Sequence, residues 1–282
     1  MEIGKVLVVG AGQMGGGIAQ VVAASGRAVA LQDSAPGATG RALEAMRRSL
    51  GKLAEKGGPD PDAVLRRVTT VERVADAAPD ADLMVEAVVE DAAVKEAVFR
   101  EADAALPPHA ILASNTSSIP IGSLAAATGR PDRVIGMHFF NPVPVLRLVE
   151  VIRSAATSDA TAAAVVALAR DLGKEPVEVR DVPGFAANRI LMPFINEAVR
   201  ALEEGVADAG GIDTVARLGF GHPMGPLALA DLIGLDTCVA IMDVLRDGLG
   251  DPRFEAAPLL RRLVAEGKLG RKSGEGFFTH PG

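Results

Sequence analysis

The chain has 282 residues, of which 49% are hydrophobic and 23% charged, and it contains 31 glycines and 18 prolines. This length suits about two domains and this composition a folded globular protein, which excludes a peptide hormone, a disordered chain and a collagen-like fibre. With 29 basic and 36 acidic residues the net charge is −7, so we expect no nucleic-acid partner, and any anionic ligand needs a local basic site.

Targeting and disulfide signals are weak in this sequence. The single cysteine, Cys238, cannot form an intrachain disulfide, and the apolar run around it predicts a buried side chain. The N-terminal residues lack the length and cleavage site of a signal peptide, and no stretch reaches the roughly 18 uninterrupted apolar residues of a membrane span. We therefore expect a cytoplasmic protein without a membrane partner.

Residues 1–183 alternate short β-branched runs with longer amphipathic segments. Strands are predicted over 5–9, 28–32, 67–71, 83–88, 110–113, 134–138, 148–152 and 177–179, and helices over 12–25, 39–55, 92–105 and 160–172. Alternation of strand and helix is typical of a parallel sheet covered by helices. We expect a Rossmann-type α/β domain over residues 1–183, with a mostly parallel, doubly wound sheet.

The character of the chain changes after Pro183. Residues 184–282 carry little strand signal, and helices are predicted over 188–204, 213–218, 227–245 and 257–266, separated by glycine and proline. These helices are too few and too apolar for a clearly self-sufficient bundle. We therefore expect an all-helical domain that contributes to substrate binding, to formation of a homodimer, or to both.

A glycine-rich motif, G-x-G-x-x-G, follows the first predicted strand and opens the first helix, where backbone N–H groups and the helix dipole can hold a pyrophosphate. Asp33 lies 18 residues after the last glycine of the motif, at the end of the second strand, where a carboxylate can accept from an adenosine ribose. This carboxylate would repel a 2′-phosphate, so NAD is favoured over NADP. The motif residues expected to bind the cofactor are Gly10, Gly12, Gln13, Met14 and Gly15.

Polar residues gather at the ends of later strands. Asn115 and Ser117 lie in the run SNTSS after the fifth predicted strand, and His138 ends the sixth. The ligand crevice of an open α/β sheet lies beyond the carboxyl ends of its strands, and histidine suits proton transfer near neutral pH. If Glu150 reaches His138, it fixes the tautomer and stabilises the imidazolium. Otherwise Glu150 is a surface charge.

Six sequence blocks in order resemble the 3-hydroxyacyl-CoA dehydrogenase family: GAGQMGGGIAQ, SNTSS, GMHFFNPVPVLRLVEVI, PGFAANRI, GHPMGPLALADLIGLD and KLGRKSGEGFF. The resemblance runs from Val6 to Phe278. In length the chain is similar to the bacterial, single-function members of the family, which act on 3-hydroxybutyryl-CoA. The resemblance implies an NAD-dependent oxidoreductase that interconverts an (S)-3-hydroxyacyl-CoA and its 3-oxoacyl form.

The resemblance also implies roles for individual residues. His138 would be the general base that takes the 3-hydroxyl proton, paired with Glu150. Ser117 and Asn188 would hydrogen-bond the reacting oxygen or the thioester, as neutral donors suited to a developing alkoxide. Asn141 would order the site around the histidine and the nicotinamide.

The resemblance further assigns residues to the binding of NAD and of CoA. The resemblance puts Glu90 and Lys95 beside the nicotinamide half of NAD, although on sequence alone both are typical of a solvated helix start. Asn115 is also expected to bind the cofactor. The phosphates of CoA need cations, which Arg41 and Lys52 in the second helix would supply. Most of that helix's basic residues fit a solvated face equally well, and no metal site is expected because the four histidines are dispersed.

Two alternatives remain open. A related β-hydroxyacid dehydrogenase that acts on a free hydroxy acid or sugar acid would keep the nucleotide fold and need no CoA-binding surface. Many such enzymes use a lysine in the interdomain helix, and residues 188–197 contain none. A catalytically idle NAD-binding protein is the other alternative, since fold alone does not guarantee turnover.

Overall fold

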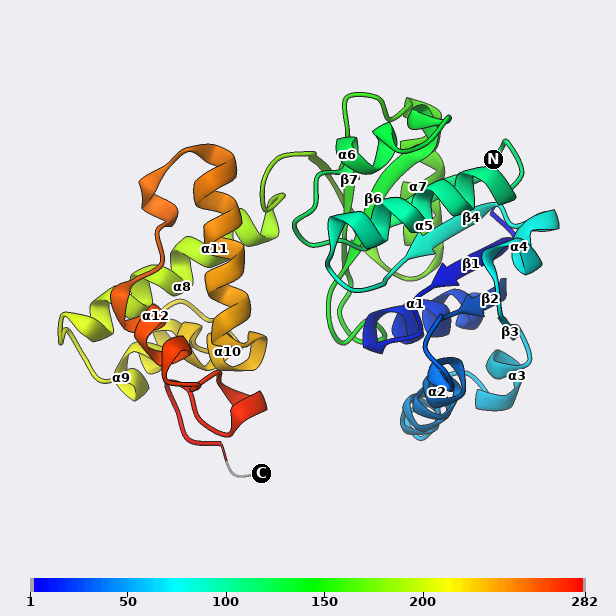
Figure 1. Cartoon of the computed structure of the whole chain (residues 1–282). Helices are drawn as coiled ribbons and strands as arrows, with labels where there is room; N and C mark the ends of the chain where they lie inside the picture. Colours follow the sequence, from blue (N-terminus) through cyan, green and yellow to red (C-terminus); the bar gives the residue numbers. More distant parts are fainter. Residues whose placement is uncertain (1–2, 281–282) are drawn as a thin grey trace. The chain divides into compact units, whose positions relative to one another are not determined.

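The computed structural model describes residues 3–280, which form two compact units (Figure 1). The first unit ends at Val182 and contains the sheet, and the second begins at Pro183 and is helical. Within the described range, no helix is both long enough and apolar enough to cross a bilayer.

The sheet of the first unit is parallel over its first six strands. Its spatial order is β3-β2-β1-β4-β5-β6-β7-β8, and within it only β6 and β7 run antiparallel to each other. This confirms the predicted Rossmann-type sheet, and each end of every predicted strand lies within two residues of the observed end. The strands are β1 (Lys5–Val9), β2 (Ala28–Gln32), β3 (Val68–Val71), β4 (Leu83–Glu86), β5 (Ile111–Ser114), β6 (Val134–Phe139), β7 (Leu148–Arg153) and β8 (Glu175–Arg180).

The inner strands are apolar because both faces of the sheet are covered. In β1 every residue after Lys5 is buried, and β4, β5 and β6 are buried along their whole length. Continuous β-branched and aliphatic runs of this kind are typical of parallel strands in α/β proteins. A buried polar residue is therefore unusual in these strands, and Glu86 at the end of β4 is one that was not predicted.

Helices of the first unit pack on this sheet. The four predicted helices are present within one residue of their expected bounds, whereas the short helices α3, α4 and α6 were not predicted. Asp91 and Ser158 cap α5 and α7 by accepting from Val94 N (3.0 Å) and Thr161 N (3.2 Å). The helices are α1 (Gln13–Ala24), α2 (Ala38–Ala54), α3 (Pro61–Leu65), α4 (Val74–Ala77), η1 (Ala78–Asp80), α5 (Ala92–Ala105), α6 (Ile121–Ala126), η2 (Pro131–Arg133) and α7 (Asp159–Asp171).

The second unit has its own apolar core, which includes Met192, Ile195, Leu227 and Cys238. Burial raises the pKa of the Cys238 thiol to about 12, and the prediction that this side chain is buried is confirmed. Its helices are α8 (Ala187–Glu203), α9 (Ala209–Thr214), the π-helical turn η3 (Val215–Gly219), α10 (Pro226–Ile233), α11 (Leu235–Leu249), η4 (Pro252–Phe254), α12 (Pro258–Ala265) and η5 (Arg271–Ser273).

One helix prediction in this unit is wrong. Residues 227–245 do not form a single helix, because Gly234 adopts φ +103° and separates α10 from α11. A positive φ is accessible to glycine at little cost and interrupts the helical hydrogen-bond pattern. The segment predicted over 213–218 also differs, since α9 begins at Ala209 and η3 continues it to Gly219.

Candidate active site

The glycine-rich loop joins β1 to α1, and its three glycines meet different demands. Gly10 has φ +99°, and a Cβ there would lie 2.5 Å from the Ala87 carbonyl oxygen. A Cβ on Gly15 would lie 1.7 Å from the carbonyl oxygen of Gly10, so the first turn of α1 packs directly on the loop. At Gly12, the N-cap of α1, a Cβ would meet no atom within 4 Å and no side chain caps the helix. The N–H groups of this helix start therefore face open space, as the pyrophosphate of a dinucleotide requires.

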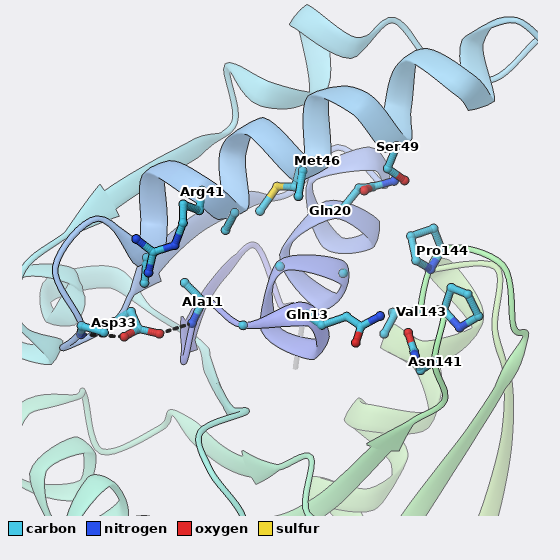
Figure 2. A pocket seen from close by; sticks show the side chains of 18 residues that line it. Ala11, Gln13, Gln20, Asp33, Arg41, Met46, Ser49, Asn141, Val143 and Pro144 are labelled. Atoms are coloured by element: carbon cyan, nitrogen blue, oxygen red, sulfur yellow. Dashed lines mark hydrogen bonds between the residues drawn. The ribbon is translucent and has the colours of Figure 1, made fainter. Parts of the chain in front are cut away.

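Asp33 stands directly after β2, beside this loop. Its Oδ2 accepts from Ala11 N at 2.6 Å and its Oδ1 from Ala35 N at 2.7 Å (Figure 2). Each carboxylate oxygen has a further lone pair, so the group can still accept from a ribose diol. The loop and Asp33 together fit the adenosine diphosphate half of a dinucleotide.

A pocket of about 610 Å³ extends from Asp33 along α1 and α2 to the loop of residues 141–144 (Figure 2). Arg41, Met46 and Ser49 line it from α2, and Asn141 and Pro144 line it from the opposite side. Gln13 also lines the pocket and points toward this loop, whereas Met14 is partly buried against the core. Most of the lining is apolar, with Asp33 and Arg41 supplying charge at one end.

A buried lysine, Lys174, holds the loop of residues 141–144 that lines this pocket. Lys174 is buried, and its Nζ donates to the carbonyl oxygens of Val143 and Leu146, the latter at 2.8 Å. Burial lowers the pKa of Lys174. Lys174 was not predicted as a site residue, although a lysine directly before a strand of the sheet is visible in the sequence.

His138 and Glu150 face each other across the antiparallel pair β6 and β7. They are register partners, both are buried, and His138 Nδ1 lies 2.9 Å from Glu150 Oε2. The Phe140 ring packs on the imidazole with the centroids 4.6 Å apart. An ionised Glu150 accepts from Nδ1–H, which leaves Nε2 as the nitrogen that can take up a proton. The sequence alternative of a surface charge at Glu150 is wrong.

The loop after β5 is organised by two side chains. Asn115 Oδ1 accepts from Phe139 N at 2.8 Å, which ties this loop to the end of β6. Glu90 Oε1 accepts from Thr116 Oγ1 (2.6 Å), Ser117 N (2.9 Å) and Ser118 N (3.0 Å). Burial opposes ionisation of Glu90, but the charge of Lys95 and these hydrogen bonds outweigh it and lower the pKa of the carboxyl. The Ser117 hydroxyl lies 3.3 Å from the same oxygen.

Lys95 does not lie on a solvated helix start, so that reading of its residue type is wrong. Its side chain is 1% exposed, and its Nζ lies 2.6 Å from Glu86 Oε1 and 3.2 Å from Glu90 Oε2. Glu86 is fully buried at the end of β4. Glu86 was recognisable in the sequence as a polar residue at the end of an apolar strand, but its pairing with Lys95 was not.

The remaining expected site residues lie on α8 and α2. Asn188 belongs to the second unit. It is buried in the first turn of α8, two residues after the N-cap residue Ala186. Lys52 is exposed on α2 and does not line the pocket that Arg41 lines. Across residues 3–280, no group of three or more His, Cys, Asp or Glu side chains could hold a metal ion.

Nearly all of the described chain matches one protein family. Residues 5–182 match the 3-hydroxyacyl-CoA dehydrogenase NAD-binding domain, and residues 184–280 match the C-terminal domain of the same family. A probable 3-hydroxybutyryl-CoA dehydrogenase of Bacillus subtilis is 52% identical over 99% of this chain and 98% of its own length. One from Deinococcus radiodurans is 54% identical over 97% of this chain and 99% of its own.

Solved structures agree with this match. The crystal structure of (S)-3-hydroxybutyryl-CoA dehydrogenase from Ralstonia eutropha has a TM-score of 0.96 with this chain, at 45% identity and full coverage of both chains. The match to the NAD-binding domain identifies NAD as the cofactor, in agreement with the open helix start at Gly12 and the position of Asp33. The chain belongs to the 3-hydroxyacyl-CoA dehydrogenase family.

Proposed function

We propose that the chain is an NAD-dependent dehydrogenase that interconverts (S)-3-hydroxybutyryl-CoA and acetoacetyl-CoA. The observation that carries the proposal is the buried pair of His138 on β6 and Glu150 on β7. The dinucleotide loop follows β1 of the same sheet. Family membership, and the names of relatives that align over nearly the whole chain, support the substrate class.

In this proposal His138 is the general base of alcohol oxidation. Bound NAD supplies the hydride acceptor. Glu150 holds Nδ1, so Nε2 takes the proton of the 3-hydroxyl, and the carboxylate stabilises the imidazolium that results. In ketone reduction the same nitrogen returns the proton to the oxygen at C3. Burial of the pair excludes water, which strengthens the interaction between the two charges.

Neutral donors complete the proposed substrate site. The hydroxyl of Ser117 and the amide of Asn188 hydrogen-bond the C3 oxygen or the thioester, and neither competes with His138 for the proton. Asn141 orders the end of the pocket next to the nicotinamide half of the cofactor. Removal of one donor to a developing alkoxide typically costs about 3 kcal/mol of transition-state stabilisation.

The CoA nucleotide is proposed to lie along α2. Arg41 lines the pocket there, and Lys52 lies exposed on the same helix. These cations supply local positive charge in a chain whose net charge is −7. Asp33, with both oxygens engaged by backbone N–H groups, favours NAD over NADP because its charge opposes a 2′-phosphate.

The test is NADH oxidation at 340 nm with acetoacetyl-CoA, with a longer 3-oxoacyl-CoA and with free acetoacetate. Fast turnover of acetoacetyl-CoA with little turnover of acetoacetate is expected, since the free acid offers nothing to the CoA-binding residues. Faster turnover of the longer thioester would correct the chain length alone. Equal turnover of acetoacetate, or no turnover of any thioester, would refute the proposal in favour of a free-acid dehydrogenase or an idle protein.

We further propose that the enzyme is a cytoplasmic homodimer that associates through its helical unit. Between residues 206 and 220, Leu218 is 80% exposed, Phe220 63% and Val206 72%, a concentration of apolar surface typical of an interface. Light scattering should give twice the 29.0 kDa mass of one chain. Leu218→Asp should give the monomer mass, whereas Val177→Asp, on the exposed edge strand β8, should leave the dimer intact. A dimer that survives Leu218→Asp would exclude this surface.

A further inference from the structure

The pocket between α1 and α2 contains a buried amide that has no hydrogen-bond partner within residues 3–280. This amide belongs to Gln20, which lines the pocket from α1 and is 3% exposed. Its side chain points from α1 toward α2, and no hydrogen bond joins it to another residue that lines the pocket (Figure 2). Buried side-chain amides are nearly always hydrogen-bonded, so an amide without a protein partner in a pocket indicates a ligand that supplies one.

Small residues surround this amide. Residues spaced by three and four positions line the pocket from one face of α1: Gln13, Gly16, Gly17 and Gln20. A Cβ on Gly17 would lie 2.9 Å from the Cβ of Val143, and one on Gly16 would lie 3.7 Å from the Cβ of Ala42. None of the residues that line the pocket is aromatic, and its charged residues lie at one end. The pocket therefore suits a slender, uncharged chain better than a purine base, which gains most from a flat side chain to stack on.

Gln20 also lies where this pocket meets a second one. Gln20 and Pro144 line both the first pocket and a neighbouring pocket of about 370 Å³. The second pocket is lined largely by aliphatic side chains, among them Leu50 and Leu172. A ligand long enough to extend from one pocket into the other therefore passes the Gln20 amide.

We propose that Gln20 is a substrate-binding residue whose amide hydrogen-bonds an amide of the pantetheine arm of the CoA thioester. This arm is a slender, uncharged chain that carries two amide groups, each with one N–H and one C=O. The glutamine side chain offers both a donor and an acceptor, so it can pair with either group. The inference rests on the proposed function, because it takes a CoA thioester as the substrate.

The experiment compares Gln20→Met with the unmodified chain on three substrates of decreasing length. These are acetoacetyl-CoA, acetoacetyl-pantetheine, which lacks the nucleotide, and S-ethyl acetothioacetate, which lacks both amides. The readouts are kcat and KM with NADH, the NADH dissociation constant from NADH fluorescence, and the thermal midpoint of the chain without ligands. Gln32→Met is the matched control, because the Gln32 amide donates to the Glu72 carbonyl oxygen at 3.1 Å and does not line the pocket.

Gln20→Met should raise the KM of acetoacetyl-CoA and of acetoacetyl-pantetheine by a similar factor of about 3 to 10, the effect of one neutral hydrogen bond. The value of kcat should stay within about twofold, since a contact remote from the reacting atoms stabilises substrate and transition state alike. The kinetics of S-ethyl acetothioacetate should not change.

Stability separates this role from a structural one. Gln20→Met should leave the thermal midpoint unchanged or raise it, because the substitution removes no hydrogen bond of the protein and places an apolar group in a buried position. Gln32→Met should do the reverse, with a slightly lower midpoint and unchanged KM values. Arg41→Met should raise the KM of acetoacetyl-CoA but not that of acetoacetyl-pantetheine, which carries no phosphate.

Four results would overturn the inference. An equal loss with S-ethyl acetothioacetate would show that Gln20 shapes the pocket and binds no amide. A loss confined to acetoacetyl-CoA would put the contact on the nucleotide, and a rise in the NADH dissociation constant alone would put it on the cofactor. Unchanged kinetics with all three substrates would exclude a contact. If Gln20→Met does not fold, Gln20→Leu makes the same comparison.

These four results leave the proposed function intact, because the unmodified chain is active in each of them. An unmodified chain that turns over none of the three thioesters would refute the proposed function and this inference with it.

Discussion

Gly12→Ala separates cofactor binding from folding. A Cβ at this position meets no protein atom within 4 Å, and the backbone has φ −71°, which alanine adopts freely. Loss of conformational freedom in the unfolded chain favours alanine by about 0.4–1 kcal/mol. The poorer helix N-capping of alanine offsets this by a similar amount, about 0.5–1 kcal/mol. The free energy of unfolding should therefore change by less than about 1 kcal/mol, or a few degrees in Tm.

Cofactor binding should change much more. The methyl group would stand where a pyrophosphate oxygen approaches the N–H groups at the start of α1. A hydrogen bond to a charged group contributes about 1.5–3 kcal/mol. Loss of one such bond predicts a rise in the NADH dissociation constant of about 10- to 150-fold, at about 1.4 kcal/mol per factor of ten. Titration of NADH fluorescence measures it.

Two other glycines serve as controls. Gly51→Ala, inside α2 and also without an atom within 4 Å, should raise stability by about 1 kcal/mol and leave NADH affinity unchanged. Gly15→Ala should impair folding, because its Cβ would lie 1.7 Å from a backbone oxygen. NADH affinity of Gly12→Ala equal to that of the unmodified chain would show that the dinucleotide does not approach this helix start.

Three further predictions concern single side chains. His138→Gln should lower turnover by roughly 100-fold or more while the NADH dissociation constant stays within a few fold, and unchanged turnover would remove His138 from the mechanism. The lowered pKa of Glu90 means that its ionised form stabilises the fold above the usual glutamate pKa of about 4.3, and that this contribution is lost as the pH falls through the folded-state pKa. The Tm difference between the unmodified chain and Glu90→Gln should accordingly shrink on acidification, and a constant difference would contradict this account. Cys238, with a pKa of about 12, should be inert to a thiol reagent at about pH 8 and react only after unfolding. Rapid labelling of the native protein would contradict its burial.

Much of the fold could be predicted from local sequence pattern. The bounds of β1, β2 and α5 agree with prediction residue for residue, because β-branched runs and amphipathic periods are local signals. The short helices α3, α4 and α6 were not predicted, because four to six residues are too few to show a helical period. The helix break at Gly234 was not predicted, because the apolar period continues on both sides of this glycine.

The site was predictable in outline but not in its pairings. The ends of β5 and β6 were expected to carry polar residues, and Asn115, Ser117 and His138 lie there. The burial of Lys95 was not predictable, because it depends on Glu86, which meets Ser114 only through the register of two strands 28 residues apart. Local residue types cannot reveal a contact that strand pairing creates.

The most direct measurement is the initial rate of NADH formation from (S)- and (R)-3-hydroxybutyryl-CoA, each with NAD and with NADP. We expect turnover of the (S) thioester with NAD, little turnover with NADP because of Asp33, and none of the (R) thioester. Turnover of the (R) thioester would contradict the proposed (S) specificity, and equal rates with both nucleotides would contradict the role of Asp33 in cofactor choice.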